Sequence, residues 1–370
     1  MIYNLKKVQD ADVNNKKVLL RVDVDVPVVD GVIQDESRLK AWFPTLEYLI
    51  NANANAKIYL IGHMGRPKQQ FPTPVSTPFG ANNFQFTISE PNLSLKPVAE
   101  WVSKKVNGQI EEEKIDIFNT WKIRDDIYLL ENLRFFEGEE KNDPAFVKKL
   151  ALIGDVFIND AFATAHRAHA STEGITKFLP SFAGVRVQKE VEELSRVLEN
   201  PLRPLAVMIG GAKIETKLPL VEKMHRIADL VLVGGEIAEN DKILLKVQHE
   251  DIEGRKSVLL VADLNQDLKD ITPKSSENFI QVLQNTGTIV WNGPMGLVEQ
   301  PPFDTGTKTL ADGIAKLSAY KILGGGDTVS CIQKIGVIDK FNFVSTGGGA
   351  MLEFLSGEKL PGLVALEVHS

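Results

Sequence analysis

The stretch DVFINDAFATAHRAHAS, Asp155–Ser171, joins a short apolar run to a polar loop. The run Asp155–Ile158 has the length and apolar content of a buried β-strand. Two histidines and an arginine then follow within four residues, His166, Arg167 and His169, separated by small alanines. Such a loop can bind an anionic group, because arginine and histidine donate to anions and small neighbours let a ligand approach closely. A solvated surface loop is the alternative. The pattern in the rest of the chain distinguishes the anion-binding loop from the surface loop.

Runs of the same kind recur along the chain and alternate with longer amphipathic segments. Ten short apolar runs are predicted strands: Lys17–Val22, Lys57–Ile61, Asp126–Leu130, Asp155–Ile158, Leu205–Ile209, Asp229–Val233, Ser257–Val261, Thr288–Trp291, Lys321–Leu323 and Asn342–Ser345. Six segments with helical spacing are predicted helices: Ser37–Ile50, Leu95–Val106, Pro144–Ile153, Val185–Leu198, Lys274–Leu283 and Thr305–Leu317. This alternation predicts an α/β fold with parallel sheets and helices on both faces.

The length of the chain predicts two domains, because 370 residues exceed the size of one ordinary hydrophobic core. The segment Val185–Leu198 carries an apolar stripe at helical spacing, and Asn200-Pro201 follows it. Predicted strands lie both before and after this segment. We therefore interpret it as the helix that connects two α/β domains.

The composition excludes several classes of protein. A formal net charge of -7 argues against a nucleic-acid-binding protein, because such proteins usually carry a basic surplus. Cys331 is the only cysteine, so no intrachain disulfide can form and a reducing compartment is expected. The first residues lack the apolar core of a signal peptide, and no apolar run approaches membrane-spanning length. We expect a soluble cytoplasmic protein with neither a nucleic-acid nor a membrane partner.

Ligands of open α/β sheets bind beyond the carboxyl ends of the strands. In the first half of the chain these positions carry acidic, basic and imidazole side chains: Asp23 and Asp25, His63 and Arg66, Arg134, and the loop that contains Arg167. Arginine and histidine gathered at strand ends suit a small acidic substrate.

The strand ends of the second half are rich in glycine instead: Gly210–Lys213 (GGAK), Gly234–Glu236 (GGE), Asn292–Pro294 (NGP), Gly324–Asp327 (GGGD) and Thr346–Gly349 (TGGG). Glycine lets backbone N–H groups approach phosphate oxygens, and a following helix N-terminus adds a favourable dipole. Lys213 and Lys217 supply positive charge, and Asp327 offers an oxygen ligand to a magnesium ion. This half suits the phosphates of a nucleotide.

Each feature alone has an ordinary structural explanation. A glycine pair at a strand end is more often a tight turn than a phosphate site. Asp23 can pair with a neighbouring arginine, His63 can be a core histidine, and Lys217 can be a solvated helix residue. The recurrence at nearly every strand end is what indicates function. The motifs GxxxxGK[ST] and GxGxxG after a strand are absent, which disfavours a P-loop enzyme and a standard Rossmann dehydrogenase.

Eight blocks of the sequence together resemble the phosphoglycerate kinase family. They run in the family order and span almost the whole chain: RVDVDVP (Arg21–Pro27), GHMGRP (Gly62–Pro67), ENLRFFEGEEKND (Glu131–Asp143), INDAFATAHRAHAS (Ile158–Ser171), GGAKIETK (Gly210–Lys217), WNGPMG (Trp291–Gly296), GGGDT (Gly324–Thr328) and STGGGA (Ser345–Ala350). Their combination is highly specific.

The resemblance implies two Rossmann-like domains with parallel sheets, joined by an interdomain helix, that close over their ligands. We expect a domain over residues 1–184 that binds 3-phosphoglycerate, and a nucleotide-binding domain over 185–355 that starts with the interdomain helix 185–199. The tail 356–370 is expected to pack back on the first domain. The helix Val185–Leu198 and the strand end Ser345-Thr346 are the expected hinges, and identical scattering profiles with and without both substrates would contradict this.

The resemblance also implies a glycolytic kinase that uses Mg2+ and transfers a phosphoryl group between 1,3-bisphosphoglycerate and ADP, giving 3-phosphoglycerate and ATP. It implies a monomer whose only partners are these small molecules. By the same resemblance, the acid substrate is bound by Asp23, Asp25, Arg38, His63, Arg66, Arg134 and Arg167. Arg38 is expected nearest the transferred group, while His166 and His169 support the site.

For the nucleotide, the resemblance implies contacts from Gly211, Ala212, Lys213, Lys217, Gly234, Gly235, Asn292, Pro294, Glu299, Gly326, Asp327 and Thr328. Within this set, Asn292, Pro294 and Glu299 are expected at the nucleoside, Asp327 at the metal and Thr328 at a phosphate. The expected catalytic residues are Arg38, Lys213, Lys217, Gly348 and Gly349. Backbone amides of Gly347, Gly348 and Gly349 would face the moving phosphoryl group.

Three positions depart from the family pattern. Asp25 stands where an asparagine is usual, and a carboxylate repels an anionic substrate. Glu236 stands where a third glycine is usual, and the segment from Ile237 to Asp270 is short, so we expect an altered nucleoside preference or weaker nucleotide affinity. The segment Gln69–Pro91 resembles an insertion. Its prolines and phenylalanines predict a loop, and it has no assigned function.

Two other functions compete with an active kinase. One is a non-enzymatic relative that binds nucleotide or a phosphorylated acid and has lost turnover through Asp25 and Glu236. The presence of the complete transfer set argues for activity, because a binding module does not need all of Arg38, Lys213, Lys217 and Asp327. The other is a different α/β enzyme acting on a phosphorylated acid, such as a dehydrogenase, which the missing dinucleotide motif disfavours.

Overall fold

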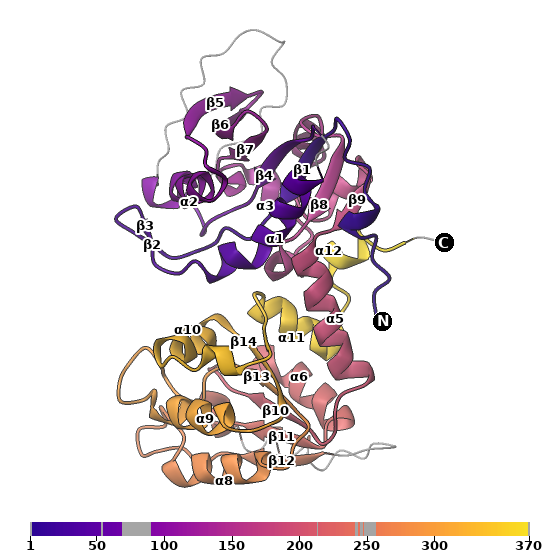
Figure 1. Cartoon of the computed structure of the whole chain (residues 1–370). Helices are drawn as coiled ribbons and strands as arrows, with labels where there is room; N and C mark the ends of the chain where they lie inside the picture. Colours follow the sequence, from indigo (N-terminus) through magenta and orange to yellow (C-terminus); the bar gives the residue numbers. More distant parts are fainter. Residues whose placement is uncertain are drawn as a thin grey trace. The chain divides into compact units, whose positions relative to one another are not determined.

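The computed structural model describes residues 2–52, 55–68, 90–212, 214–240, 243–244, 247 and 257–368. Lys213 and nearly all of the expected insertion Gln69–Pro91 lie outside the described residues. Contacts within the chain separate two compact units (Figure 1). The N-terminal unit comprises Tyr3–Lys189 and Leu360–Ser370, and the C-terminal unit comprises Met1–Ile2 and Glu190–Lys359.

The N-terminal unit is built on a seven-stranded sheet with the order β5-β6-β7-β4-β1-β8-β9. Its strands are β1 (Lys17–Arg21), β4 (Lys57–Ile61), β5 (Glu111–Ile115), β6 (Phe118–Arg124), β7 (Ile127–Leu130), β8 (Val156–Asn159) and β9 (Ser181–Ala183). In this order, the five strands β7, β4, β1, β8 and β9 pair in parallel. The hairpin β5–β6 adds an antiparallel edge. Because β4 and β8 flank β1 in parallel, the segments that follow these three strands meet at one edge of the sheet.

The C-terminal unit contains a six-stranded parallel sheet with the order β12-β11-β10-β13-β14-β15. Its strands are β10 (Leu205–Ile209), β11 (Leu230–Val233), β12 (Val258–Val261), β13 (Thr288–Asn292), β14 (Tyr320–Gly324) and β15 (Phe343–Val344). Numbered along the chain, this is the doubly wound order 3-2-1-4-5-6, whose winding direction reverses between β10 and β13. Ligands of such sheets bind at that reversal, beyond the carboxyl ends of the strands.

Helices surround both sheets (Figure 1). The N-terminal unit contains α1 (Ser37–Asn51), α2 (Lys96–Val106), α3 (Glu137–Glu140), α4 (Pro144–Ala151) and α12 (Pro361–Val364). The C-terminal unit contains α6 (Ile214–Ile227), α8 (Pro273–Leu283), α9 (Thr305–Ala315), α10 (Gly326–Lys334) and α11 (Gly348–Ser356). The division between the units falls within α5 (Val185–Glu199), at Glu190.

Short elements complete the chain. A small hairpin consists of β2 (Val28–Val29) and β3 (Val32–Ile33). The 3-10 helices are η1 (Val8–Asp10), η2 (Pro91–Leu93), η3 (Leu133–Phe135), η4 (Phe162–Thr164), η5 (Gly174–Lys177), η6 (Glu236–Glu239) and η7 (Ile338–Lys340).

The α/β fold with parallel sheets is confirmed. All ten predicted strands and all six predicted helices are present, with ends that differ by at most two residues. Apolar periodicity did not reveal β2, β3, β5, β6 or β9, nor the helices α3, α6, α10, α11 and α12. Four of the ten predicted strands precede α5. The structure has more strands there, so this expectation is too low.

Both faces of the N-terminal sheet are covered, which explains the continuous apolar sequence of β1. Val18 and Leu20 pack in one cluster with Trp42 of α1. Leu19 points to the opposite face and packs in a second cluster with Phe146 of α4. Side chains from α8 and α9 cover one face of the C-terminal sheet, where they pack in one cluster with Met208 and Trp291.

Two helices start at clear sequence signals. In α4, the Asp143 side chain accepts a hydrogen bond from Phe146 N over 2.9 Å, and Pro144 occupies the first turn. In α8, the Thr272 side chain caps Ser275 N in the same manner. A capping side chain followed by proline in the first turn is a strong start signal.

The segment after Lys359 belongs to the N-terminal unit. Leu5 and Glu367 form an antiparallel bridge, and Gly362 N donates to Ala165 O over 2.8 Å. Among the described residues, the longest apolar helices still fall short of what a bilayer crossing requires.

Candidate active site

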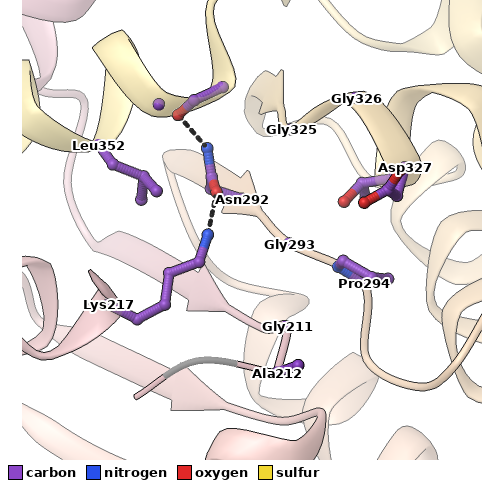
Figure 2. Close-up of a pocket in the computed structure, with 13 residues that line it drawn as sticks. Gly211, Ala212, Lys217, Asn292, Gly293, Pro294, Gly325, Gly326, Asp327 and Leu352 are labelled. Carbon is purple, nitrogen blue, oxygen red and sulfur yellow. Dashed lines mark hydrogen bonds between the residues drawn. The ribbon is translucent and has the colours of Figure 1, made fainter. Parts of the chain in front are cut away.

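A pocket of about 390 Å³ opens at the winding reversal of the C-terminal sheet (Figure 2). It is lined by Gly211, Ala212, Lys217, Asn292, Gly293, Pro294, Gly325, Gly326, Asp327, Thr328, Gly348, Gly349 and Leu352. These residues follow β10, β13 and β14 or lie at the start of α6, α10 and α11. The position is the one at which a doubly wound sheet binds its ligand.

The first turns of α10 and α11 contribute directly to this pocket. Gly325 precedes α10 and Gly347 precedes α11, and neither helix has a side-chain cap. The first N–H groups of a helix have no partner within the helix, and the helix dipole adds a partial positive charge there. Two such ends in one pocket, beside the first turns of α6, form a site for phosphate groups.

The pocket loops pack so closely that they require glycine. Gly293 has a φ of 93°, and a Cβ atom there would collide with the backbone of Gly210. Gly235 has a φ of 67° and lies against the backbone of Gly211 and Pro294. Gly234 and Gly235 were expected at the nucleotide, but the structure places them beneath the lining loops and outside the lining itself.

Lys217 is held inside the pocket by a neighbour on β13. Its Nζ donates to Asn292 Oδ1 over 2.7 Å, and Asn292 Nδ2 donates to Gly348 O over 3.4 Å (Figure 2). Burial lowers the pKa of Lys217 to about 8, and the Asp327 carboxylate partly opposes this shift. The ammonium group is thus desolvated and directed at the position where we expect an anion.

Asp327 and Thr328 occupy the first turn of α10. Asp327 is exposed, and Figure 2 shows its carboxylate on the other side of the pocket from Lys217. The buried Thr328 Oγ1 has no hydrogen-bond partner among the described residues. An unpaired buried hydroxyl is costly, so Thr328 is poised to accept or donate to a ligand.

The pocket suits a magnesium ion that arrives with a nucleotide. The described residues contain no cluster of three histidine, cysteine or acidic side chains that could hold a metal by itself. Protein sites for Mg2+ commonly supply only one or two carboxylates and leave the other positions to phosphates and water. Asp327 at the pocket edge fits that requirement.

The structure does not place three residues that we expected at or near the nucleotide in this pocket. Lys213 lies outside the described residues. Glu299 is exposed and does not line the pocket. Glu236, the departure from the family pattern, is exposed at the start of η6.

The N-terminal unit gathers a second site at the carboxyl ends of β1, β4 and β8. Arg38 lies in the first turn of α1, and its Nη1 pairs with the Asp23 carboxylate over 3.4 Å. The Asp23 charge raises the pKa of Arg38. Trp42 Nε1 donates to the Asp23 carbonyl over 3.1 Å. Asp23 therefore orients Arg38, whose side chain remains 33% exposed.

Asp25 contacts the loop after β4. Its Oδ1 accepts a hydrogen bond from Gly65 N over 2.9 Å, which ties this carboxylate to the segment that carries His63 and Arg66. Arg66 is exposed, and Arg134 is almost completely buried. Arg134 Nη1 donates to Gly65 O over 2.6 Å, so both Asp25 and Arg134 hold the same loop.

Arg167 is half-buried in the loop Asn159–Ser171, and its Nε donates to His166 Nε2 over 3.2 Å. His169 lies in the same loop, and burial together with nearby arginines lowers its pKa to about 4. Burial also lowers the pKa of His166. Both histidines are therefore neutral at physiological pH and support the site without adding charge.

Two residues of this site escaped the sequence interpretation. Arg21, the last residue of β1, is 1% exposed and contacts His63 and Ser171. Glu139 is completely buried and accepts from Ser171. Arg21 fell inside the predicted strand Lys17–Val22, although an arginine in an otherwise apolar run was a signal that it has a buried partner.

Comparison with known proteins identifies the family. The family model for phosphoglycerate kinase matches residues 8–265 and 245–358. A curated phosphoglycerate kinase from Finegoldia magna is 37% identical over 412 residues, covering 98% of this chain and 99% of that protein.

Solved structures agree with this comparison. Phosphoglycerate kinase from Coxiella burnetii is 32% identical with a TM-score of 0.76, and that from Pyrococcus horikoshii OT3 is 30% identical with a TM-score of 0.75. Each alignment covers 98% of both chains. The chain therefore belongs to the phosphoglycerate kinase family, whose members are phosphotransferases with a carboxyl group as the acceptor.

Proposed function

We propose that this member of the family catalyses Mg2+-dependent phosphoryl transfer between 1,3-bisphosphoglycerate and ADP, giving 3-phosphoglycerate and ATP. The observation that carries the proposal is the pair of chemically different sites on two doubly wound sheets. One is a cluster of arginine side chains around His63 in the N-terminal unit. The other is the pocket of helix N-termini and Lys217 in the C-terminal unit.

In this proposal the N-terminal unit binds the acid substrate. Arg38 is oriented by Asp23, and Arg134 is fixed by the Gly65 carbonyl, so neither guanidinium has to be ordered when the anion arrives. Pre-ordered donors reduce the entropic cost of binding. The complete set is Asp23, Asp25, Arg38, His63, Arg66, Arg134 and Arg167.

The C-terminal unit binds the nucleotide in this proposal. Phosphates accept hydrogen bonds from the first turns of α10 and α11, and Lys217 supplies a positive charge. Asp327 would hold Mg2+, which neutralises phosphate charge when bound. The proposed contacts remain Gly211, Ala212, Lys213, Lys217, Gly234, Gly235, Asn292, Pro294, Glu299, Gly326, Asp327 and Thr328, with Gly348 and Gly349 at the transferred group.

The proposed chemistry needs no general base. In the direction of ATP consumption the nucleophile is a substrate carboxylate, which is ionised at neutral pH because carboxyl pKa values lie near 4. Catalysis then depends on positioning and on neutralising negative charge. Arg38, Lys217 and backbone N–H groups provide those functions. We also infer a monomeric cytoplasmic enzyme, for which the single, largely buried Cys331 and the family resemblance are the support.

A coupled assay of ATP-dependent 3-phosphoglycerate phosphorylation tests the proposal. We expect turnover by the wild type, and a kcat that is lower by about 10²–10³ in Arg38→Ala, because one pre-ordered donor at a developing charge contributes that much. Binding of both ligands without turnover would instead support the non-enzymatic alternative, which no observation favours. Unchanged activity in Arg38→Ala would show that the phosphoryl group is transferred at a position that Arg38 does not contact.

A further inference from the structure

A continuous chain of buried hydrogen bonds links Glu139 to His63. The Glu139 carboxylate accepts from Ser171 Oγ over 2.5 Å and from Ser171 N over 3.1 Å. Arg21 Nε donates to the same Ser171 Oγ over 3.0 Å, and Arg21 Nη2 lies 2.6 Å from His63 Nδ1. All four side chains are almost completely excluded from solvent.

The direction of the bonds that Arg21 makes in this chain is fixed by chemistry. A guanidinium group can only donate, so His63 Nδ1 has to be the acceptor of the bond from Arg21. A neutral imidazole carries one proton, and that proton then resides on Nε2. Ser171 Oγ accepts from Arg21 Nε, so its own hydroxyl proton is free to point toward Glu139.

The surroundings of His63 favour the neutral ring. Burial and the positive charges of Arg21, Arg134 and Arg167 lower its pKa well below the ordinary value, and His169 acts in the same direction. The acidic groups near Arg21 and Arg134 are Glu139, Asp23, Asp25 and Glu140, and none of them is among the groups that shift the pKa of His63. A fourth positive charge beside three guanidinium groups is therefore disfavoured.

The backbone makes room for this contact. A Cβ atom at Gly62 would lie 3.3 Å from Arg21 Nη1 and still closer to Val24. Glycine at the end of β4 thus lets the guanidinium pass beside the backbone and reach the next residue, His63. Arg21 Nη1 also donates to Val22 O, so three of its nitrogens have fixed partners.

We propose that Arg21 is a positioning residue that holds His63 as the neutral tautomer protonated on Nε2. His63 Nε2 has no hydrogen-bond partner among the described residues, so its proton is available to an anionic oxygen. The opposite tautomer would present a lone pair, which repels an anion. The inference rests on the proposed function only in taking that anion to be the 3-phosphoglycerate end of the substrate.

Nitrogen NMR of the uniformly 15N-labelled full-length protein tests the tautomer directly. A long-range proton–nitrogen correlation distinguishes protonated from unprotonated ring nitrogens, and the His63→Gln variant assigns the signals. We expect one fixed tautomer with protonated Nε2 and unprotonated Nδ1, unchanged from about pH 8 to about pH 6. A protonated Nδ1, averaged tautomers or an imidazolium ring would overturn the inference.

Variants separate positioning from general stability. In Arg21→Gln we expect averaged His63 tautomers and a KM for 3-phosphoglycerate that is higher by about tenfold, the effect of one charged hydrogen bond. The KM for ATP should change less than about twofold, because the nucleotide pocket does not contain this chain. Arg124→Gln removes a partly buried arginine that pairs with Asp126 and is the matched control.

Two further measurements test the proposal if Arg21→Gln does not fold. Ser171→Ala removes the bond that fixes Arg21 Nε, and we expect a smaller change of the His63 signals in the same direction. The wild-type spectrum also reports the His63 tautomer by itself, without any variant. An absence of turnover in the wild type would defeat the proposed function, whereas a wrong tautomer in an active enzyme would defeat only the role of Arg21.

Discussion

Lys217 Nζ donates to Asn292 Oδ1 over 2.7 Å, so the ammonium group is held in the pocket of the C-terminal unit by a side chain at the end of β13. Burial lowers the pKa of this lysine to about 8. Lys217 is charged below that pKa and neutral above it. The affinity of the free enzyme for a nucleotide should therefore depend on pH near 8.

We expect kcat/KM for ATP to fall as the pH rises through about 8, because this ratio reports groups of the free enzyme. Lys217→Arg should remove that fall, since arginine stays charged throughout the range. Lys223→Arg, on the same helix and outside the pocket lining, should retain it. A fall of equal size in Lys217→Arg would assign the pH dependence to another group.

Asp25→Asn should lower the KM for 3-phosphoglycerate. The carboxylate accepts from Gly65 N over 2.9 Å, and an amide oxygen can keep this bond while the negative charge is removed. We expect a decrease of about twofold to fivefold, the usual effect of one partly screened like charge. Steady-state kinetics at saturating ATP measures it.

Asp23→Asn is the matched control for this change. Asp23 pairs with Arg38, so loss of its charge should leave Arg38 less well oriented and raise the KM. A higher KM in both variants would show that Asp25 assists binding, contrary to the prediction.

Two glycines of the nucleotide pocket should respond differently to alanine. Gly293→Ala places a Cβ against the Gly210 backbone at a φ of 93°, and we expect a loss of stability of about 1–3 kcal/mol from strain alone. At Gly326 a Cβ has no atom within 4 Å. Gly326→Ala should therefore keep the melting temperature of the wild type and raise only the KM for ATP.

Thermal unfolding together with ATP kinetics distinguishes the two variants. An unchanged KM for ATP in a stable Gly326→Ala protein would show that the nucleotide does not use the space beside the first turn of α10.

Asp160 should make the protein less stable at high pH. It is completely buried after β8, its Oδ1 accepts from Val187 N over 3.1 Å, and burial raises its pKa to about 7. The folded protein then holds this proton more tightly than the unfolded chain, whose aspartate has a pKa near 3.8. Stability is therefore lost as the pH rises from about 4 through about 7.

We expect Asp160→Asn to raise the melting temperature at about pH 8 by roughly 5 °C, and by much less at about pH 5. The asparagine oxygen can still accept from Val187 N, but no charge has to be buried. Asp312→Asn, at an exposed position, is the control. Equal differences from the wild type at both pH values would contradict the assigned cause.

Apolar periodicity predicted the strands that are buried on both faces, such as β1 and β10, because burial requires an unbroken apolar run. It could not predict β5, whose residues Glu111–Ile115 are four-fifths charged and exposed at the sheet edge. It also missed α6, which contains Pro219, and α11, which starts with two glycines. Their sequences carry signals of turns, and only the packing against the sheet makes them helical.

The candidate site was predictable where its residues follow strands, because the topology brings strand ends together. Lys217, Asn292 and Asp327 line one pocket as that rule requires. The partners that orient the site were not predictable. Arg21 and Glu139 lie more than a hundred residues apart and meet only through Ser171, a relation that no local pattern encodes.

The bridge between Leu5 and Glu367 has a consequence for how the chain matures. The N-terminal unit is interrupted by Glu190–Lys359, so a ribosome synthesises the whole C-terminal unit before it delivers the segment that contains Gly362. All seven strands of the N-terminal sheet precede α5, but the unit lacks α12 and the bridge to Leu5 while the C-terminal unit is made. During vectorial synthesis the N-terminal unit is therefore completed only after Glu367, the bridge partner of Leu5, has left the exit tunnel.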